Sequence, residues 1–212
     1  MLPGWAPADA ISGVVLGLLL AASISTWAVL LHQAFRLRRV QHDLRLSRAL
    51  FWQAPDWQQA LQVLNDTENE GLLSHLAEAS QAPLAGTLAA STSVTAQTER
   101  ALRDALHQAS ARLHHGHTFL ASVAASAPFV GLLGTVWGVR RAMLGLDASA
   151  LVGLERLAAP VGEALLMTAL GLGVAIPALI AHNLLSRQAR VLEAELEGFA
   201  HDLLALRAPA QA

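Results

Sequence analysis

The chain has 212 residues, of which 54% are hydrophobic and only 14% are charged, so much of it is predicted to face lipid. If three stretches of about 20 residues cross a bilayer, what remains is one modest soluble portion, which excludes a large catalytic domain. The absence of cysteine excludes disulfides and thiolate chemistry, and a formal net charge of −2 argues against nucleic-acid binding.

Three windows of the chain are long and apolar enough to span a membrane, which requires about 20 mostly apolar residues. Residues 11–31 and 118–139 carry no charge, and residues 157–181 carry a single acid, Glu163. The ten residues before the first window contain no Arg or Lys. We therefore expect the first window to be a retained anchor and not a cleaved signal peptide.

The distribution of arginines predicts the orientation of these spans. Arg36, Arg38, Arg39, Arg45 and Arg48 follow the first window, and a basic cluster beside a span marks the cytoplasmic side. The expected order is a periplasmic N-terminus (1–10), transmembrane helix 1 (11–31), a cytoplasmic helical segment (32–117), transmembrane helix 2 (118–139), a periplasmic loop (140–156), transmembrane helix 3 (157–181) and a cytoplasmic helical tail (182–212).

Two arginines depart from this pattern. Arg140 and Arg141 fall on the outer side, where basic residues are uncommon. We expect them to extend to the outer interface or to pair with Asp147 or Glu155.

The cytoplasmic segment is predicted to be helical. Asp56 and Gln59 have the spacing of a capping box that opens a short helix through Val63, and residues 70–79 favour a second short helix. Leucines and alanines recur at helical spacing over 102–113, which predicts a helix from near Thr95 that continues unbroken into the second span. The third span should also extend into the cytoplasm. The predicted fold is an all-α membrane protein with three transmembrane helices.

Small residues are concentrated in the second and third spans, where they permit close contact between helix backbones. Thr135 shares a helical face with Gly131 and Gly138, so its hydroxyl is expected to face a helix junction or a pore. In the alternative interpretation, the hydroxyl only bonds the carbonyl four residues earlier. The residues assigned to helix packing are Pro128, Gly131, Gly134, Gly138, Gly171 and Pro177.

Glu163 is the sharper functional signal, because a charge in hydrocarbon is costly and is usually retained with a partner, in a water-filled cavity or for a function. Alternatively, it lies near the outer interface and reaches water. Thr168 follows five positions later, about 140° around an ideal helix. The two side chains therefore need not line one surface unless Pro160, Gly162 or an adjoining subunit brings them together.

No cofactor, metal site or enzyme active site is predicted. His114, His115 and His117 cluster, but the chain has no cysteine and the nearest acid is Asp104, so we favour a location at the inner membrane interface. No phosphate-binding loop, nucleophile elbow or zinc-protease helix is present in the sequence.

Two longer stretches resemble a known family. Residues 127–139 read APFVGLLGTVWGV and residues 162–183 read GEALLMTALGLGVAIPALIAHN. Both resemble the paired signatures of the MotA/TolQ/ExbB proton-channel family, and of its ExbB and TolQ branch in particular. The resemblance covers roughly residues 100–190, and it extends to the first span by topology only.

The resemblance implies a homo-oligomeric ring in the bacterial inner membrane, a pentamer in this family, around an ExbD- or TolR-like single-span partner. Proton flow would drive a TonB- or TolA-like transducer for outer-membrane transport or maintenance. The positions matching Thr135, Glu163 and Thr168 are implicated in the proton pathway, and the titrating aspartate is on the partner. Met167 departs from the alanine that is usual at its position, and Arg140 and Arg141 are more basic than in many relatives.

Two alternatives to a proton channel remain open. One is a non-conducting scaffold for a partner anchor, and the other is a channel subunit that uses another ion, such as Na⁺. The sequence also leaves open whether the role is ExbB-type or TolQ-type.

Overall fold

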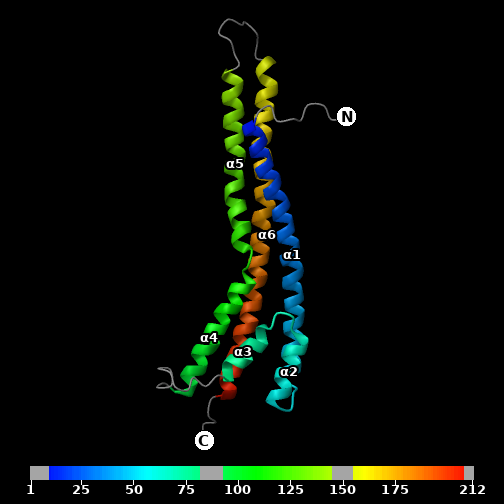
Figure 1. Ribbon diagram of the computed structural model, residues 1–212, viewed down its shortest axis with the longest axis vertical. Helices are drawn as coiled ribbons and strands as arrows, with labels where there is room; N and C mark the ends of the chain where they lie inside the picture. The colour runs from blue at the N-terminus through cyan, green and yellow to red at the C-terminus, as the bar shows by residue number, and fades with distance from the viewer. Residues whose placement is uncertain (1–9, 82–92, 145–154, 208–212) are drawn as a thin grey trace. The chain divides into compact units, whose positions relative to one another are not determined.

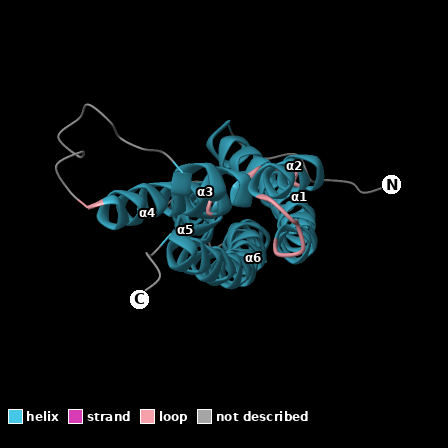
Figure 2. Cartoon of the chain, turned by 90° about the horizontal axis from the view of Figure 1, so that it is seen from below, coloured by secondary structure: helices cyan, strands magenta, loops and turns pink. Residues whose placement is uncertain are grey.

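The computed structural model describes residues 10–81, 93–144 and 155–207, and all regular structure in these ranges is helical (Figure 2). This confirms the predicted all-α class. The helices are α1 (Ala10–Phe51), α2 (Trp57–Thr67), α3 (Leu72–Gln81), α4 (Val94–Leu113), α5 (His117–Leu144) and α6 (Glu155–Arg207).

Within the described ranges, α1, α5 and α6 are long and apolar enough to cross a membrane (Figure 1). They contain the three predicted spans. The helices α1 and α6 have 42 and 53 residues, about twice what a bilayer requires, so each continues well beyond its apolar stretch. The extension of the third predicted span as one helix is therefore confirmed.

The chain forms two compact units, and the first comprises residues 1–32 and 116–184. Its core lies where α1, α5 and α6 pack together. Large apolar side chains such as Ile24, Phe129 and Ile180 also cover its outside, as expected for helices that face lipid. The buried core consists of Val15, Leu16, Leu19, Val123, Ala127, Met167, Val174, Ala175 and Ala178.

The second unit comprises residues 33–115 and 185–212. In this unit Phe51 makes edge-to-face contacts with Trp57 and Phe199, at ring-centroid distances of 5.7 and 5.1 Å. Arg36 holds both carboxylate oxygens of Glu70, at 2.5 and 2.6 Å, in a bidentate ion pair. The unit thus has its own aromatic and ionic contacts.

The short helices begin where local backbone chemistry favours a start. The Asp56 carboxylate accepts the N–H of Gln59 at 2.8 Å, as the capping pattern predicted, and α2 runs four residues past Val63. Gly71 has a φ of +60°, a conformation that glycine adopts without steric cost, and α3 begins directly after it. The Glu68 carboxylate then accepts the first free N–H groups of α3.

The prediction of an unbroken helix from Thr95 into the second span is wrong. The helix α4 ends at Leu113 and α5 begins at His117, because Gly116 between them has a φ of +80°. Side chains of α1 supply hydrogen bonds at the end of α4. The amide of Gln33 donates to the His115 carbonyl, and the Arg36 guanidinium donates to the Arg112 carbonyl at 3.0 Å. Periodicity of the apolar residues cannot reveal such a break.

Candidate functional site

The helices α5 and α6 approach so closely that only glycine fits at several contacts. A Cβ added to Gly131 would lie 2.7 Å from the Met167 carbonyl oxygen, and one added to Gly171 would lie 2.7 Å from the Ala127 carbonyl oxygen. Nothing larger than hydrogen can occupy these positions without moving a backbone. A Cβ on Gly134 or Gly138 would also meet atoms of α6 at under 3.0 Å. The proline positions Pro128 and Pro177 lie inside α5 and α6.

This close approach brings Thr135 of α5 to Thr168 of α6, and their hydroxyls form a hydrogen bond. The Thr135 hydroxyl oxygen also lies 3.1 Å from the Ala164 carbonyl oxygen and 3.2 Å from that of Gly131. A hydroxyl has one proton to donate, so Thr135 can satisfy only one acceptor at a time, while Thr168 can donate to Thr135. The two threonines therefore form a polar contact whose donor and acceptor can exchange.

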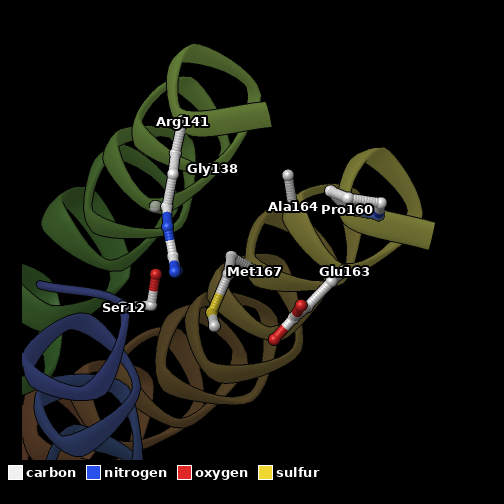
Figure 3. Close-up of a pocket in the computed structure, with 8 residues that line it drawn as sticks. Ser12, Gly138, Arg141, Pro160, Glu163, Ala164 and Met167 are labelled. Atoms are coloured by element: carbon white, nitrogen blue, oxygen red, sulfur yellow. The ribbon is translucent and has the colours of Figure 1, made fainter. Parts of the chain in front are cut away.

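Glu163 lies apart from the threonine pair, on a cavity of about 240 Å³ between α1, α5 and α6. Thr168 does not line this cavity, and α6 stays helical through Pro160, so the side chains of Glu163 and Thr168 remain five positions apart along one helix. Figure 3 shows Glu163 projecting from α6 and Arg141 extending from α5 toward Ser12 of α1. The cavity is lined by Ser12, Gly134, Gly138, Arg141, Pro160, Glu163, Ala164 and Met167.

The structure distinguishes the two arginines that depart from the charge pattern. The Arg140 guanidinium lies 5.0 Å from the Trp137 ring centroid, a cation–π distance, whereas Arg141 lines the cavity with Glu163. The predicted partners, Asp147 and the Glu155 side chain, lie outside the described residues. The spacing of Arg141 from Gly138 and Gly134, three and seven residues, was the signal that it shares their helical face.

The clustered histidines have separate surroundings. His114 Nε2 lies 3.1 Å from a carboxylate oxygen of Glu193, whereas the His117 ring packs edge-to-face against His182 at a centroid distance of 6.3 Å. His182 Nδ1 donates to the His117 carbonyl at 3.1 Å, because a carbonyl oxygen can only accept. Within the described ranges, no three His, Asp or Glu side chains gather as a metal site.

One titratable group with an unusual environment was missed from the sequence. Burial raises the pKa of Glu68, in the second unit, from 4.5 to about 7, although the N–H groups of Ser74 and Leu73 oppose the shift and the Asp43 carboxylate adds to it. A polar segment such as 65–70 gives no sequence signal that one of its acids is buried.

Comparison with known proteins gives a consistent family assignment. Residues 74–198 match the MotA/TolQ/ExbB proton channel family. The chain is 39% identical over 207 residues to the biopolymer transport protein ExbB of Xanthomonas campestris, covering 93% of this chain and 82% of that protein. It is 31% identical over 208 residues to the ExbB of Salmonella typhimurium, covering 92% of this chain and 80% of that protein. It is 29% identical over 203 residues to the Tol-Pal system protein TolQ of Haemophilus influenzae, covering 88% and 84% of the two chains.

The family match includes both threonines, the cavity residues of α5 and α6 and the whole of α5, and the family description is of channels and not of enzymes. Together with the three membrane-capable helices, these matches indicate a multi-pass protein of the inner membrane. The chain belongs to the MotA/TolQ/ExbB proton channel family.

Proposed function

We propose that this chain is the proton-conducting subunit of an ExbB- or TolQ-type complex in the bacterial inner membrane. It would assemble as a homo-oligomer, the pentamer of this family, around an ExbD- or TolR-like single-span protein. Proton flow would then energise a TonB- or TolA-like transducer for outer-membrane transport or maintenance. The N-terminus would be periplasmic and the C-terminus cytoplasmic, as the arginine distribution predicts.

The hydroxyl contact between Thr135 and Thr168 is the observation that carries this proposal. Threonine does not titrate near neutral pH, but its hydroxyl can donate to an ionised carboxylate and accept from a protonated one. Because the donor and the acceptor in this pair can exchange, the pair can hydrogen-bond a carboxyl group on the partner in both its ionised and its protonated state. This property suits a site past which protons move one at a time.

The cavity beside Glu163 supports a second part of the same pathway. Its volume of about 240 Å³ leaves room for several water molecules, and its walls supply the polar groups of Ser12, Arg141 and Glu163. We propose that water in this cavity connects Glu163 to the outer solution. The membrane potential supplies about 2.3 kcal/mol per charge for each 100 mV, so a large mechanical step requires several protons.

The proposal is tested in cells whose only copy of the gene carries Thr135→Ala, Thr168→Ala or Glu163→Ala. We expect each variant to insert and assemble but to lose transducer-dependent uptake or outer-membrane integrity. Ser126→Ala is the matched control, because Ser126 lies in the same span as Thr135 and, among the described residues, its hydroxyl bonds only the Ser122 carbonyl of its own helix, at 2.7 Å. Normal function in all three variants would contradict the proposal.

Two further measurements separate the alternatives. A scaffold that conducts nothing predicts that an intramembrane aspartate of the partner is dispensable, whereas the channel requires it. A channel for another ion predicts activity that follows a sodium gradient and survives a proton uncoupler.

A further inference from the structure

The cytoplasmic part of α1 presents a row of exposed side chains that the channel function does not use. Arg38, His42, Arg45 and Ala49 recur at spacings of four, three and four residues, which places them on one face of α1. Trp52 follows three residues later, in the turn directly after the helix, where its N–H bonds the Arg48 carbonyl at 3.4 Å. All five are exposed. We refer to these five residues as the basic stripe.

Two hollows open along the basic stripe, both within the second unit. The first, of about 490 Å³, is lined by Arg38, Gln41, His42, Arg45, Leu46 and Ala49. The second, of about 370 Å³, shares Arg45 and Ala49 with the first and adds an apolar end formed by Leu44, Leu73 and Trp52, with Arg48 and Glu195 also in its wall. The surface therefore offers cationic groups at one end and an apolar recess at the other.

Two of its guanidinium groups are available to an external acid. Arg38 makes no hydrogen bond or ion pair with the described residues. Arg45 lies 3.9 Å from Glu195, at the limit of an ion pair, and its side chain is 68% exposed. Such an exposed ion pair contributes little to stability, so Glu195 does not hold Arg45 in place. By contrast Arg48, which lines the second hollow, is held by Asp202 at 2.9 Å.

We propose that the basic stripe is a docking surface for an acidic segment of a partner protein. The segment would place carboxylates against Arg38 and Arg45 and an apolar side chain in the recess beside Trp52. Charge complementarity identifies the occupant, because the first hollow contains cationic and imidazole side chains and no acid.

A lipid surface and a second copy of the chain fit this face less well. The basic stripe runs from Arg38 on α1 to Trp52 directly after it, about 21 Å at the rise of a helix, whereas the headgroup region adds only about 5–8 Å to each side of the hydrocarbon. A headgroup also has no apolar group for the recess. The same face of a second copy carries the same positive charge, which would repel it. This inference does not depend on whether the chain conducts protons.

The test uses the full chain in nanodiscs of neutral phosphatidylcholine and a fluorescent peptide of about 15 residues, a helical length that matches the stripe. The peptide carries glutamates three and four residues apart and a leucine at one end, and a control peptide carries lysines in their place. We expect saturable binding of the acidic peptide only, weakened by salt. Arg38→Gln/Arg45→Gln should weaken binding about tenfold, because two surface ion pairs are lost.

The matched control is Arg39→Gln/Arg103→Gln, which removes the same charge from exposed arginines that line neither hollow. It should change the affinity by less than about twofold. Equal weakening by both double variants would overturn the proposal, as would undiminished binding to Arg38→Gln/Arg45→Gln. Binding only to vesicles that contain phosphatidylglycerol would assign the surface to the membrane instead, and self-association that depends on Arg38 and Arg45 would assign it to a second copy.

Discussion

At the residue scale, Glu68 shows how a surface-like sequence can contain a buried acid. Its carboxylate accepts the N–H of Leu73 at 3.0 Å and the N–H of Ser74 at 3.2 Å, so it caps α3 while being largely withdrawn from water. Burial prevails over these favourable bonds, and the pKa of Glu68 rises from 4.5 to about 7.

This shift predicts a pH dependence of stability with a definite sign. The folded state holds the Glu68 proton more tightly than the unfolded state, so the second unit loses stability as the pH rises from about 4.5 to about 7. The loss is on the order of 3 kcal/mol, since one pKa unit corresponds to about 1.4 kcal/mol. Hydrogen exchange of the α3 amides in the intact protein, followed through this pH range, measures it.

Glu68→Gln should remove this dependence, because an amide keeps an acceptor oxygen and carries no charge at any of these pH values. Glu78→Gln is the control, since Glu78 lies exposed on α3. The exchange rates of the α3 amides are first corrected for the pH dependence of intrinsic exchange. Equal corrected rates in wild type and Glu68→Gln at every pH would contradict the raised pKa of Glu68.

The sequence placed Thr135 and Thr168 in two spans, and the resemblance to the family assigned both of them to the proton pathway. It could not establish that they meet, because the contact depends on the register between α5 and α6. That register is set by close approach at Gly131 and Gly171, which is a property of two helices together.

At the element scale, the contact between α5 and α6 predicts contrasting effects of two alanine substitutions. Gly131→Ala should destabilise the protein by about 1–3 kcal/mol, because its Cβ would lie 2.7 Å from the Met167 carbonyl oxygen and force the helices apart. Gly173→Ala should be neutral or slightly stabilising, because a Cβ at Gly173 meets nothing within 4 Å.

The midpoint of unfolding of the purified protein in increasing concentrations of a denaturing detergent measures the stability of both variants on the same scale. We also expect Gly131→Ala to lose channel function, since it separates Thr135 from Thr168, while Gly173→Ala keeps it. Equal midpoints for the two variants would show that α5 and α6 do not pack through Gly131.

Helix existence was easier to predict than helix ends. The capping residue Asp56 and the apolar periodicity gave α2 and the start of α4 near their observed positions, because both signals are local. The break before α5 was missed, since apolar periodicity does not report the left-handed conformation of Gly116. The side chains that hydrogen-bond the carbonyls at the end of α4, Gln33 and Arg36, are also distant from it in sequence. That Arg141 lines a cavity could not be predicted either, because this cavity exists only between three helices.

At the scale of the whole molecule, the orientation of the spans is a direct prediction. The chain has no cysteine, so one introduced cysteine is the only labelling site. His42→Cys should react with a membrane-impermeant maleimide only after the inner membrane is opened, whereas Ala148→Cys should react before. The opposite pattern would invert the topology and place the basic stripe outside the cytoplasm.

The central claim is that this chain, with its partner, forms a gated proton path at Thr135 and Thr168. Its most direct test is proton flux into liposomes that contain the chain and an ExbD- or TolR-like protein, at an imposed potential. We predict flux that requires the partner, is lost in Thr168→Ala and persists in Ser126→Ala. An assembled wild-type complex that passes no protons while a control proton carrier does, or flux that Thr168→Ala leaves unchanged, would contradict the account.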